Sequence, residues 1–274
     1  MAGQAALIAC ILLASSAETG ENVDTSKPLT PPSWRIAPEV SHYRYKEPGV
    51  MKNEGTLYGV VGSYTFYDYG QNRSTRSASN SGNTVTLEGR LASGEMDYDG
   101  SDMYTNEPIS MSGIDDFLLD LRMLWGRERP EAKWLNAVYI GAGYRYLNDD
   151  SSSLPGGYER KSNYLYVPLG SRKDFDLADR WSLSLRGEFD LLLIGRQISY
   201  LGDADPNEPT VRNWQWPGFG TVLSLDLRYL TRNVDFALSP FVRYWWLDDS
   251  STSEGYYEPE NNTFEYGLSF VVRF

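Results

Sequence analysis

The chain contains one histidine, His42, which directly follows Ser41 in the N-terminal part of the sequence. An imidazole can act as a general base near neutral pH, and a serine hydroxyl beside it is a candidate nucleophile for hydrolysis. Such a site also needs an acidic group placed by the fold, and the sequence alone identifies none. Lone histidines are more often structural, so we predict no catalytic residue and keep hydrolysis through His42 as the alternative hypothesis.

The acidic stretch from Asp203 to Asn207 begins like a calcium-binding loop. Such loops need a glycine at the sharp turn and a bidentate glutamate at the end, but Glu208 and Trp214 occupy these positions here. The stretch therefore predicts a solvated acidic loop. We predict no metal site and no cofactor.

Carboxylates and arginines recur at alternate positions along several apolar segments. Glu188 and Asp190, for example, alternate with Phe189 and Leu191. If the polar positions face one enclosed space, they form an ion-pair network there. Every cation in this set is arginine, which suits a confined interior because the guanidinium binds carboxylates bidentately and stays charged. The predicted network comprises Glu88, Arg90, Asp116, Asp120, Arg122, Arg145, Arg186, Glu188, Asp190, Asp226, Arg228, Arg243, Glu265 and Arg273.

The elements that place these residues are strands with one apolar and one polar face. The last twelve residues, TFEYGLSFVVRF, show this alternation and end on an aromatic residue, Phe274. This segment resembles the terminal signature of bacterial outer-membrane β-barrel proteins of the small ten-stranded type, although no functional family is identified. The resemblance implies that Tyr266, Leu268, Phe270 and Phe274 form an assembly signal read by the barrel-assembly machinery.

The whole chain divides into strand-like segments separated by turns and loops. We predict an all-β fold, a closed antiparallel transmembrane β-barrel of about ten strands in an up-and-down meander, with both termini periplasmic. Pro38, Pro168 and Pro240 lie inside predicted strands and predict bulges or irregular pairing. The predicted strands cover residues 34 to 47, 55 to 70, 83 to 97, 113 to 126, 134 to 148, 158 to 172, 180 to 196, 218 to 231, 234 to 247 and 262 to 274.

Short and long connections alternate between the two sides of this barrel. The connections at 127 to 133, 173 to 179 and 232 to 233 are predicted periplasmic turns, and 71 to 82 is a long exception on that side. Those at 98 to 112, 149 to 157, 197 to 217 and 248 to 261 are predicted extracellular loops. Tryptophans fall at strand ends, where amphipathic rings anchor a barrel at the membrane interface. These predicted anchors are Trp34, Trp125, Trp134, Trp181, Trp214, Trp216, Trp245 and Trp246.

The N-terminal region predicts export. Residues 1 to 17 contain an apolar run followed by small residues and are predicted to be a cleaved signal peptide, which removes Cys10, the one cysteine. Residues 18 to 33 are polar and proline-rich and are predicted to be a periplasmic leader. Residues 34 to 274 form the predicted barrel domain, and no mature stretch approaches the roughly 20 apolar residues of a spanning helix.

The net charge of -12 argues against a nucleic-acid partner. Acidic residues gather in predicted loops, which suggests the hypothesis that they share divalent cations with lipopolysaccharide. The expected partners are outer-membrane lipid, lipopolysaccharide, the assembly machinery and small solutes.

Alternation alone does not say which face points inward, and a soluble lipocalin-like barrel would have the inverse arrangement. Tryptophans at the ends of the apolar face, and charges of both signs on the polar face, favour lipid outside. A balanced interior favours ion-pair packing over a selective channel. We therefore expect an outer-membrane protein with a charge-filled lumen that has a structural or surface-interaction role, or forms a narrow porin-like pore. An outer-leaflet lipid or peptide hydrolase using His42 is the alternative.

Overall fold

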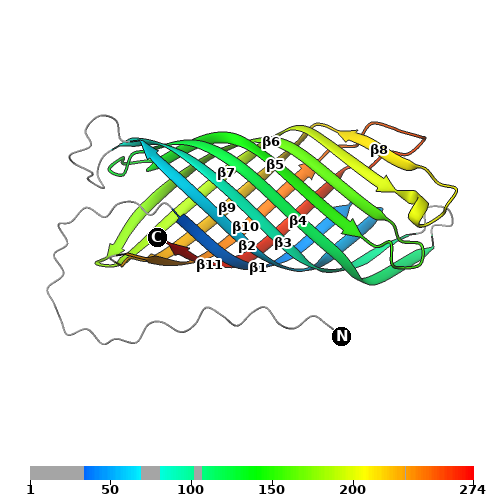
Figure 1. Cartoon of the computed structure of the whole chain (residues 1–274), viewed down its shortest axis with the longest axis horizontal. Coiled ribbons are helices and arrows are strands. Elements are labelled where there is room, and N and C mark those ends of the chain that lie inside the picture. The colour runs from blue at the N-terminus through cyan, green and yellow to red at the C-terminus, as the bar shows by residue number, and fades with distance from the viewer. Residues whose placement is uncertain (1–33, 69–80, 102–106, 232) are drawn as a thin grey trace.

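The computed structural model describes residues 34–68, 81–101, 107–231 and 233–274, which form a closed barrel of antiparallel strands (Figure 1). The predicted signal peptide and leader lie outside the described residues. The elements are β1 (Trp34–Glu47), β2 (Met51–Asp68), β3 (Gly82–Ser101), β4 (Pro108–Glu128), β5 (Ala137–Asp150), β6 (Glu159–Ala178), β7 (Trp181–Tyr200), the 3-10 helix η1 (Leu201–Asp203), β8 (Thr210–Gln215), β9 (Gly218–Tyr229), β10 (Asp235–Leu247) and β11 (Asn261–Arg273).

The sheet closes because β1 pairs with both β2 and β11, while β6 pairs with both β5 and β7. β7 pairs along its first half with β9 and along its second half with β8. β8 and β9 therefore share one place in the barrel, separated by Trp216 and Pro217. This arrangement confirms the predicted closed, antiparallel barrel with ten strand positions.

The connection predicted at residues 197 to 217 is wrong in detail, because β7 continues to Tyr200 and β8 lies within the predicted loop. The connection predicted at 98 to 112 is also shorter than expected, since β3 reaches Ser101 and β4 starts at Pro108. The ends of β3 and β4 carry polar residues on their outer face, including Asp97, Asp99 and Ser112. They extend the ladder beyond the part of the barrel in which apolar alternation reveals a strand.

The three prolines differ in their effect on pairing. The β1–β11 ladder lacks partners at Ala37 and Pro38, and the β10–β9 ladder lacks them at Ser239 and Pro240, but the register is the same on both sides of each gap. The expectation of bulges or irregular pairing at Pro38 and Pro240 is therefore confirmed in the form of irregular pairing, without a bulge. Because proline has no N–H, it leaves the ladder open on one side only. Near Pro168, the β6–β7 register does shift.

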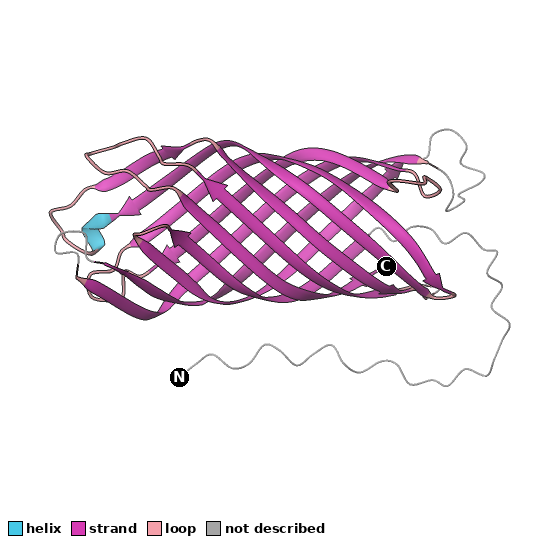
Figure 2. Cartoon of the chain, turned by 180° about the vertical axis from the view of Figure 1, so that it is seen from behind, coloured by secondary structure: helices cyan, strands magenta, loops and turns pink. Residues whose placement is uncertain are grey.

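Both ends of the described chain meet at one end of the barrel, opposite β8 (Figures 1 and 2). The Trp34 N–H donates to the Phe274 carbonyl oxygen at 2.9 Å, and the Phe274 N–H donates back at 3.1 Å. We call this end the terminal end and the other the loop end. The loop end carries η1, β8 and the connection from 248 to 260.

The outer face is divided into an apolar belt and a polar collar. On β3, the outward residues Leu87 and Leu91 are exposed and apolar, whereas Glu95 and Asp97 continue the same face toward the loop end. About nine tilted residues per strand give the belt a height of roughly 20–25 Å, the size of the apolar band of a transmembrane barrel. The belt includes Ile36, Val40, Val60, Leu87, Leu91, Leu121, Ile140, Leu169, Phe189, Leu223, Leu238 and Phe270. The collar includes Arg44, Lys46, Glu95, Asp97, Asp99 and Asp115.

No helix in the described ranges is long and apolar enough to cross a membrane.

Candidate functional site

The interior of the barrel is divided along its axis into zones that succeed one another on β1. Inward residues alternate along this strand, with Arg35 nearest the terminal end, then Glu39, Tyr43 and Glu47. Each of these residues belongs to a different zone: a cavity, a layer of ion pairs, a layer of apolar side chains and a second charged cluster.

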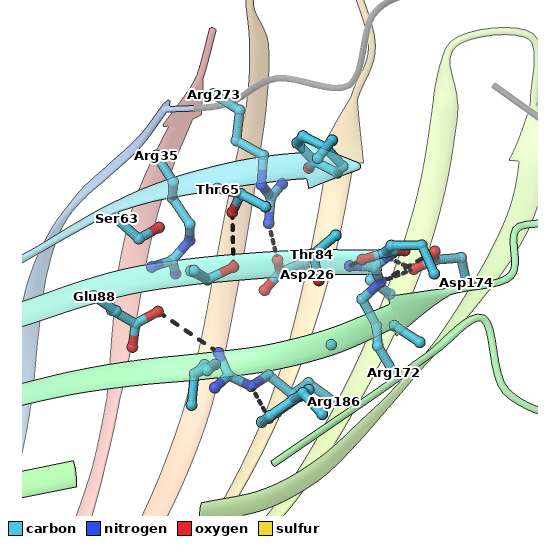
Figure 3. Close-up of a pocket in the computed structure, with 18 of the residues that line it drawn as sticks. Arg35, Ser63, Thr65, Thr84, Glu88, Arg172, Asp174, Arg186, Asp226 and Arg273 are labelled. Carbon is cyan, nitrogen blue, oxygen red and sulfur yellow. Dashed lines mark hydrogen bonds and ion pairs between the residues drawn. The ribbon is translucent and has the colours of Figure 1, made fainter. Parts of the chain in front are cut away.

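The terminal-end zone contains a cavity of about 430 Å³ (Figure 3). Its lining includes Pro130 and Leu230 from connections at the terminal end, so the cavity reaches this mouth of the barrel. The walls carry hydroxyls and charged groups from most strands. The charged lining residues are Arg35, Glu88, Glu128, Arg172, Asp174, Arg186, Asp226, Arg228, Asp235 and Arg273.

Above the cavity, one set of charges forms an alternating ring that spans the interior. Arg122, on β4, donates to Glu188 of β7 at 2.5 Å and also to Glu88 of β3. Arg186 donates to Glu188 at 2.7 Å and lies 3.9 Å from Glu88. The Tyr139 hydroxyl donates to Glu188 at 2.6 Å and accepts from Arg186 Nε at 2.6 Å. We call Glu88, Arg122, Arg186 and Glu188 the cross-barrel ring.

A second alternating ring lies where the first and last strands meet. Arg243 Nη2 donates to Glu39 Oε2 at 3.0 Å, and its Nη1 donates to Glu265 Oε1 at 3.1 Å. Arg90 Nε donates to Glu39 Oε1 at 2.6 Å, and its Nη2 donates to Glu265. The Ser41 hydroxyl donates to Glu265 at 2.7 Å. We call Glu39, Arg90, Arg243 and Glu265 the seam ring.

Little space remains between the two rings. A cavity of about 60 Å³ lies there, which has room for a few water molecules. Its lining includes Asp120, which accepts from the Tyr166 hydroxyl at 2.6 Å and lies 3.9 Å from Arg145 Nη1. Arg145 in turn lies over the Trp245 ring, 5.5 Å from its centroid. The interior therefore narrows sharply on leaving the terminal-end cavity.

Apolar side chains fill the interior on the loop side of the rings. Two buried clusters, one from β1 to β4 and one from β6, β7 and β10, lie on different walls, and Leu147 packs against both. Apolar side chains therefore extend from one wall to the other. We call this zone the apolar plug; its members are Tyr43, Tyr45, Met51, Leu57, Ala92, Met96, Ile114, Leu118, Tyr164, Tyr166, Leu192, Trp245 and Leu247, with Leu147 between the clusters.

The apolar plug corrects the prediction of an interior that is polar along its full length. Leu57, Met96 and Leu118 are almost fully buried and face inward, like the charged residues below them. Such positions make both faces of a strand apolar. Alternation then no longer distinguishes the lumen from the exterior.

A last charged cluster lies beyond the apolar plug. Arg160 donates to Glu47 and to Asp149, both at 2.8 Å, and its guanidinium lies 4.6 Å from the Tyr45 ring centroid. Glu258, from the connection between β10 and β11, is buried beside this cluster and accepts from the Ser199 hydroxyl at 2.8 Å. Burial raises the pKa of the Glu258 carboxyl, while Arg160 opposes the rise and Glu47 adds to it.

Several residues of the predicted network lie outside both rings. Asp226 accepts from Arg273 and from the Ser239 hydroxyl, and Arg228 lies 3.6 Å from Asp235. Asp120 and Arg145 line the narrow space between the rings. Asp190 and Asp116 each have one buried oxygen without a hydrogen-bond partner among the described residues.

The sequence interpretation missed inward charges on strands whose alternation is weak. Glu39, the most connected carboxylate of the seam ring, lies on β1 between Ala37 and Ser41. Arg35 and Arg160 were missed as well. The shared parity of Arg35, Glu39 and Tyr43 was the available signal for the first strand.

Most predicted interface tryptophans do face outward. Trp34, Trp125, Trp181, Trp214 and Trp216 are exposed; Trp134, 79% exposed, belongs to the connection after β4, and Trp246 is partly exposed.

Trp245 is the exception, and its assignment as an interface anchor is wrong. Its side chain is 3% exposed and packs against Tyr164 and Tyr166 inside the apolar plug. Adjacent residues of a strand point to opposite faces, so Trp245 and Trp246 cannot both face outward.

The same geometry separates Ser41 from His42. Ser41 is buried in the interior, where its hydroxyl donates to Glu265. His42 lies on the outer face, with its ring centroid 5.3 Å from that of Tyr266. The two side chains cannot act on one substrate together. The structure therefore gives no support to a hydrolase built on this pair.

The predicted assembly-signal residues Tyr266, Leu268, Phe270 and Phe274 are exposed on the outer side of the last strand. Asp203 and Asp205 lie in the connection between β7 and β8; Asp203 accepts from the Glu159 N–H, and Asp205 from Asn207. Within the described ranges, no group of three or more histidine, cysteine, aspartate or glutamate residues is arranged to hold a metal ion.

No protein-family model and no curated protein matches the chain. Solved structures with a similar arrangement include the outer membrane protease OmpT from Escherichia coli, at 10% identity, 91% coverage of this chain and 99% of that chain, with a TM-score of 0.43. The transport unit of the autotransporter AIDA-I from Escherichia coli matches at 7% identity, 93% and 92% coverage and a TM-score of 0.42. Neisserial surface protein A matches at 11% identity, with 88% of this chain and 97% of that chain covered and a TM-score of 0.36. Likeness at this level carries no functional assignment.

Proposed function

We propose that this chain, which has the architecture of a small bacterial outer-membrane β-barrel, resides in the outer membrane of a Gram-negative-type bacterium as a closed barrel. Its role there is structural and surface-presenting rather than conducting. The observation that carries this proposal is the apolar plug. It fills the loop-side interior of a barrel whose outer face carries the apolar belt.

The apolar belt supports residence in a membrane. Exposed leucine, valine, isoleucine and phenylalanine side chains cover the middle of the outer face, far more than a soluble protein leaves in water. Each buried methylene of such a surface contributes about 0.8 kcal/mol when hydrocarbon replaces water. Folding in aqueous buffer would expose the whole belt.

The distribution of polar residues supports the orientation. The collar and the longest described connection, from 248 to 260, lie at the loop end, whereas the two-residue turn from 179 to 180 lies at the terminal end. Outer-membrane barrels have short periplasmic turns and longer extracellular loops. We therefore place the terminal end in the periplasm and the collar at the cell surface, in contact with lipopolysaccharide.

The apolar plug argues against a passage for ions. Crossing it requires an ion to leave water between Tyr43, Leu118 and Trp245, where aromatic and aliphatic side chains replace its hydration shell. Each of the two rings below the plug has two carboxylates and two arginines, so the rings add no excess of one sign that would select an ion for passage. The charges are better explained as packing of the narrow interior.

Two measurements test the proposal. The folded protein should appear in the outer-membrane fraction as a heat-modifiable band, and the purified protein should give no steady conductance in planar bilayers. A Tyr166→Ala/Trp245→Ala variant, which removes two large plug side chains, should conduct and so serves as the positive control. Stable folding in detergent-free buffer would contradict the membrane assignment, and steady wild-type channels would contradict the closed lumen.

A further inference from the structure

Two arginines of the terminal-end cavity lie directly opposite each other on neighbouring strands. Arg35 of β1 pairs in register with Arg273 of β11, so both side chains point into the barrel from adjacent positions. Directly opposed like charges destabilise a sheet unless a counter-charge lies between or beside them.

Only one of these arginines has such a counter-charge. Arg273 donates to Asp226, which is held in turn by the Ser239 hydroxyl. The Arg35 guanidinium makes no ion pair or hydrogen bond with any residue in the described part of the chain, and Figure 3 shows it extending toward the cavity with no partner.

The nearby carboxylates are already engaged. Glu88 is shared by Arg122 and Arg186, and Asp226 is taken by Arg273. Even Arg273 keeps one nitrogen, Nη1, without a hydrogen-bond partner among the described residues. This side of the cavity therefore has more cationic donors than acceptors.

Neutral donors lie on the next strand. Arg35 pairs in register with Ser63 of β2, and Thr65, two residues further on, lines the same cavity. A guanidinium flanked by hydroxyls in a confined space is suited to an oxyanion, because its N–H groups match two oxygens of a carboxylate or phosphate.

We propose that the terminal-end cavity is a binding site for a small soluble oxyanion, a phosphate or carboxylate group, held by Arg35 with help from Ser63. The cavity volume of about 430 Å³ admits a small solute in addition to this group. A lipid headgroup is a poorer occupant, because the cavity walls are the inner faces of the strands and hydrocarbon lies on their outer faces.

The ligand binds at the terminal end and does not pass through. Beyond this cavity, the open space inside the barrel is a second cavity of about 60 Å³, and the apolar plug follows. The site is therefore a blind pocket that fills and empties through one mouth. Binding rests on the cavity alone and does not depend on the compartment that the terminal end faces.

Isothermal titration of the detergent-solubilised full barrel with inorganic phosphate, and separately with acetate, tests this site. At low ionic strength, we expect saturable binding of at least one anion with a dissociation constant of about 1 mM or tighter. Arg35→Gln should weaken binding about tenfold, and Arg35→Lys should restore part of it.

Arg44→Gln is the matched control, since Arg44 lies on the same strand but on the outer face. It should bind the anion like the wild type. A heat-modifiable band must show that each variant is folded, and Arg35→Lys keeps the test decisive if Arg35→Gln does not fold. Equal binding by wild type and the folded Arg35 variants, or no binding of either anion by the wild type, would overturn the proposal.

Discussion

Glu39 and Arg243 lie 204 residues apart in the sequence, yet Arg243 Nη2 donates to Glu39 Oε2 at 3.0 Å inside the barrel. Glu39 also accepts from Arg90, so one carboxylate binds two guanidinium groups. The seam ring thereby links β1, β3, β10 and β11, and its charges are almost completely withdrawn from solvent.

The Glu39→Gln variant should lose about 3–5 kcal/mol of unfolding free energy, because it leaves Arg90 and Arg243 buried with Glu265 as their one carboxylate. Urea unfolding of the lipid-reconstituted protein measures the loss. Glu54→Gln is the control: Glu54 pairs with Lys52 at the surface, where water screens the interaction, and its loss should be much smaller. Equal losses in the two variants would show that the seam ring does not stabilise closure.

The Leu118→Ala variant should lose about 2–5 kcal/mol, because it opens a cavity in the apolar plug, where Leu118 is 2% exposed. The same urea assay applies. In Leu121→Ala, on the outer face of the same strand, lipid can fill the space, so the loss should be smaller. The reverse order would indicate that the loop-side interior is loosely packed.

An arginine introduced in the apolar belt should be costly and one in the collar should not. Leu121→Arg places a charge among lipid tails and should cost about 2–4 kcal/mol, whereas Ser112→Arg, on the outer face of the same strand within the collar, should leave unfolding free energy nearly unchanged. Folding yield into vesicles and urea midpoints provide the comparison. Similar costs at both positions would mean that the belt does not mark the hydrocarbon boundary.

The stability difference between wild type and Glu258→Gln should depend on pH. Burial raises the folded-state pKa of Glu258, so the penalty for its ionised form is present above that pKa and is relieved as the pH falls through it. Glutamine carries no such penalty. At neutral pH, Glu258→Gln should therefore have a higher unfolding free energy than the wild type, and this difference should shrink on acidification. A pH-independent difference in urea midpoints would refute this account.

Much of the fold follows from alternation in the sequence. The predicted strand at 34 to 47 coincides with β1, and those ending at 247 and starting at 218 agree with β10 and β9 at these bounds. Lipid outside and charge inside impose opposite chemistry on the two faces over the height of the membrane. Strand position and parity can therefore be predicted there.

Strand position and direction could not be predicted where the two faces of a strand have similar chemistry. β8 lies beyond the belt, and its inward Asn213 and Gln215 are as polar as its outward Arg212, so no apolar face marks it as a strand. At the apolar plug the opposite happens, since inward Leu57 and outward Tyr58 are both apolar. The sequence then does not show which face of the strand points into the barrel.

The partners within the site could not be predicted either. Balanced carboxylates and arginines predict that ion pairs exist, but the register and the tilt of the strands decide which groups meet. Arg122 reaches Glu188 across the interior, and Arg35 meets Arg273 only because the barrel closes.

The seam ring also has a consequence for the order of biogenesis. Two of its members come from the first strands, Glu39 and Arg90, while Arg243 and Glu265 come from the last two. A nascent polypeptide that ends before β11 would enclose both guanidinium groups with a single counter-ion. Charge neutrality at the junction is reached only when β11 pairs with β1 and supplies Glu265.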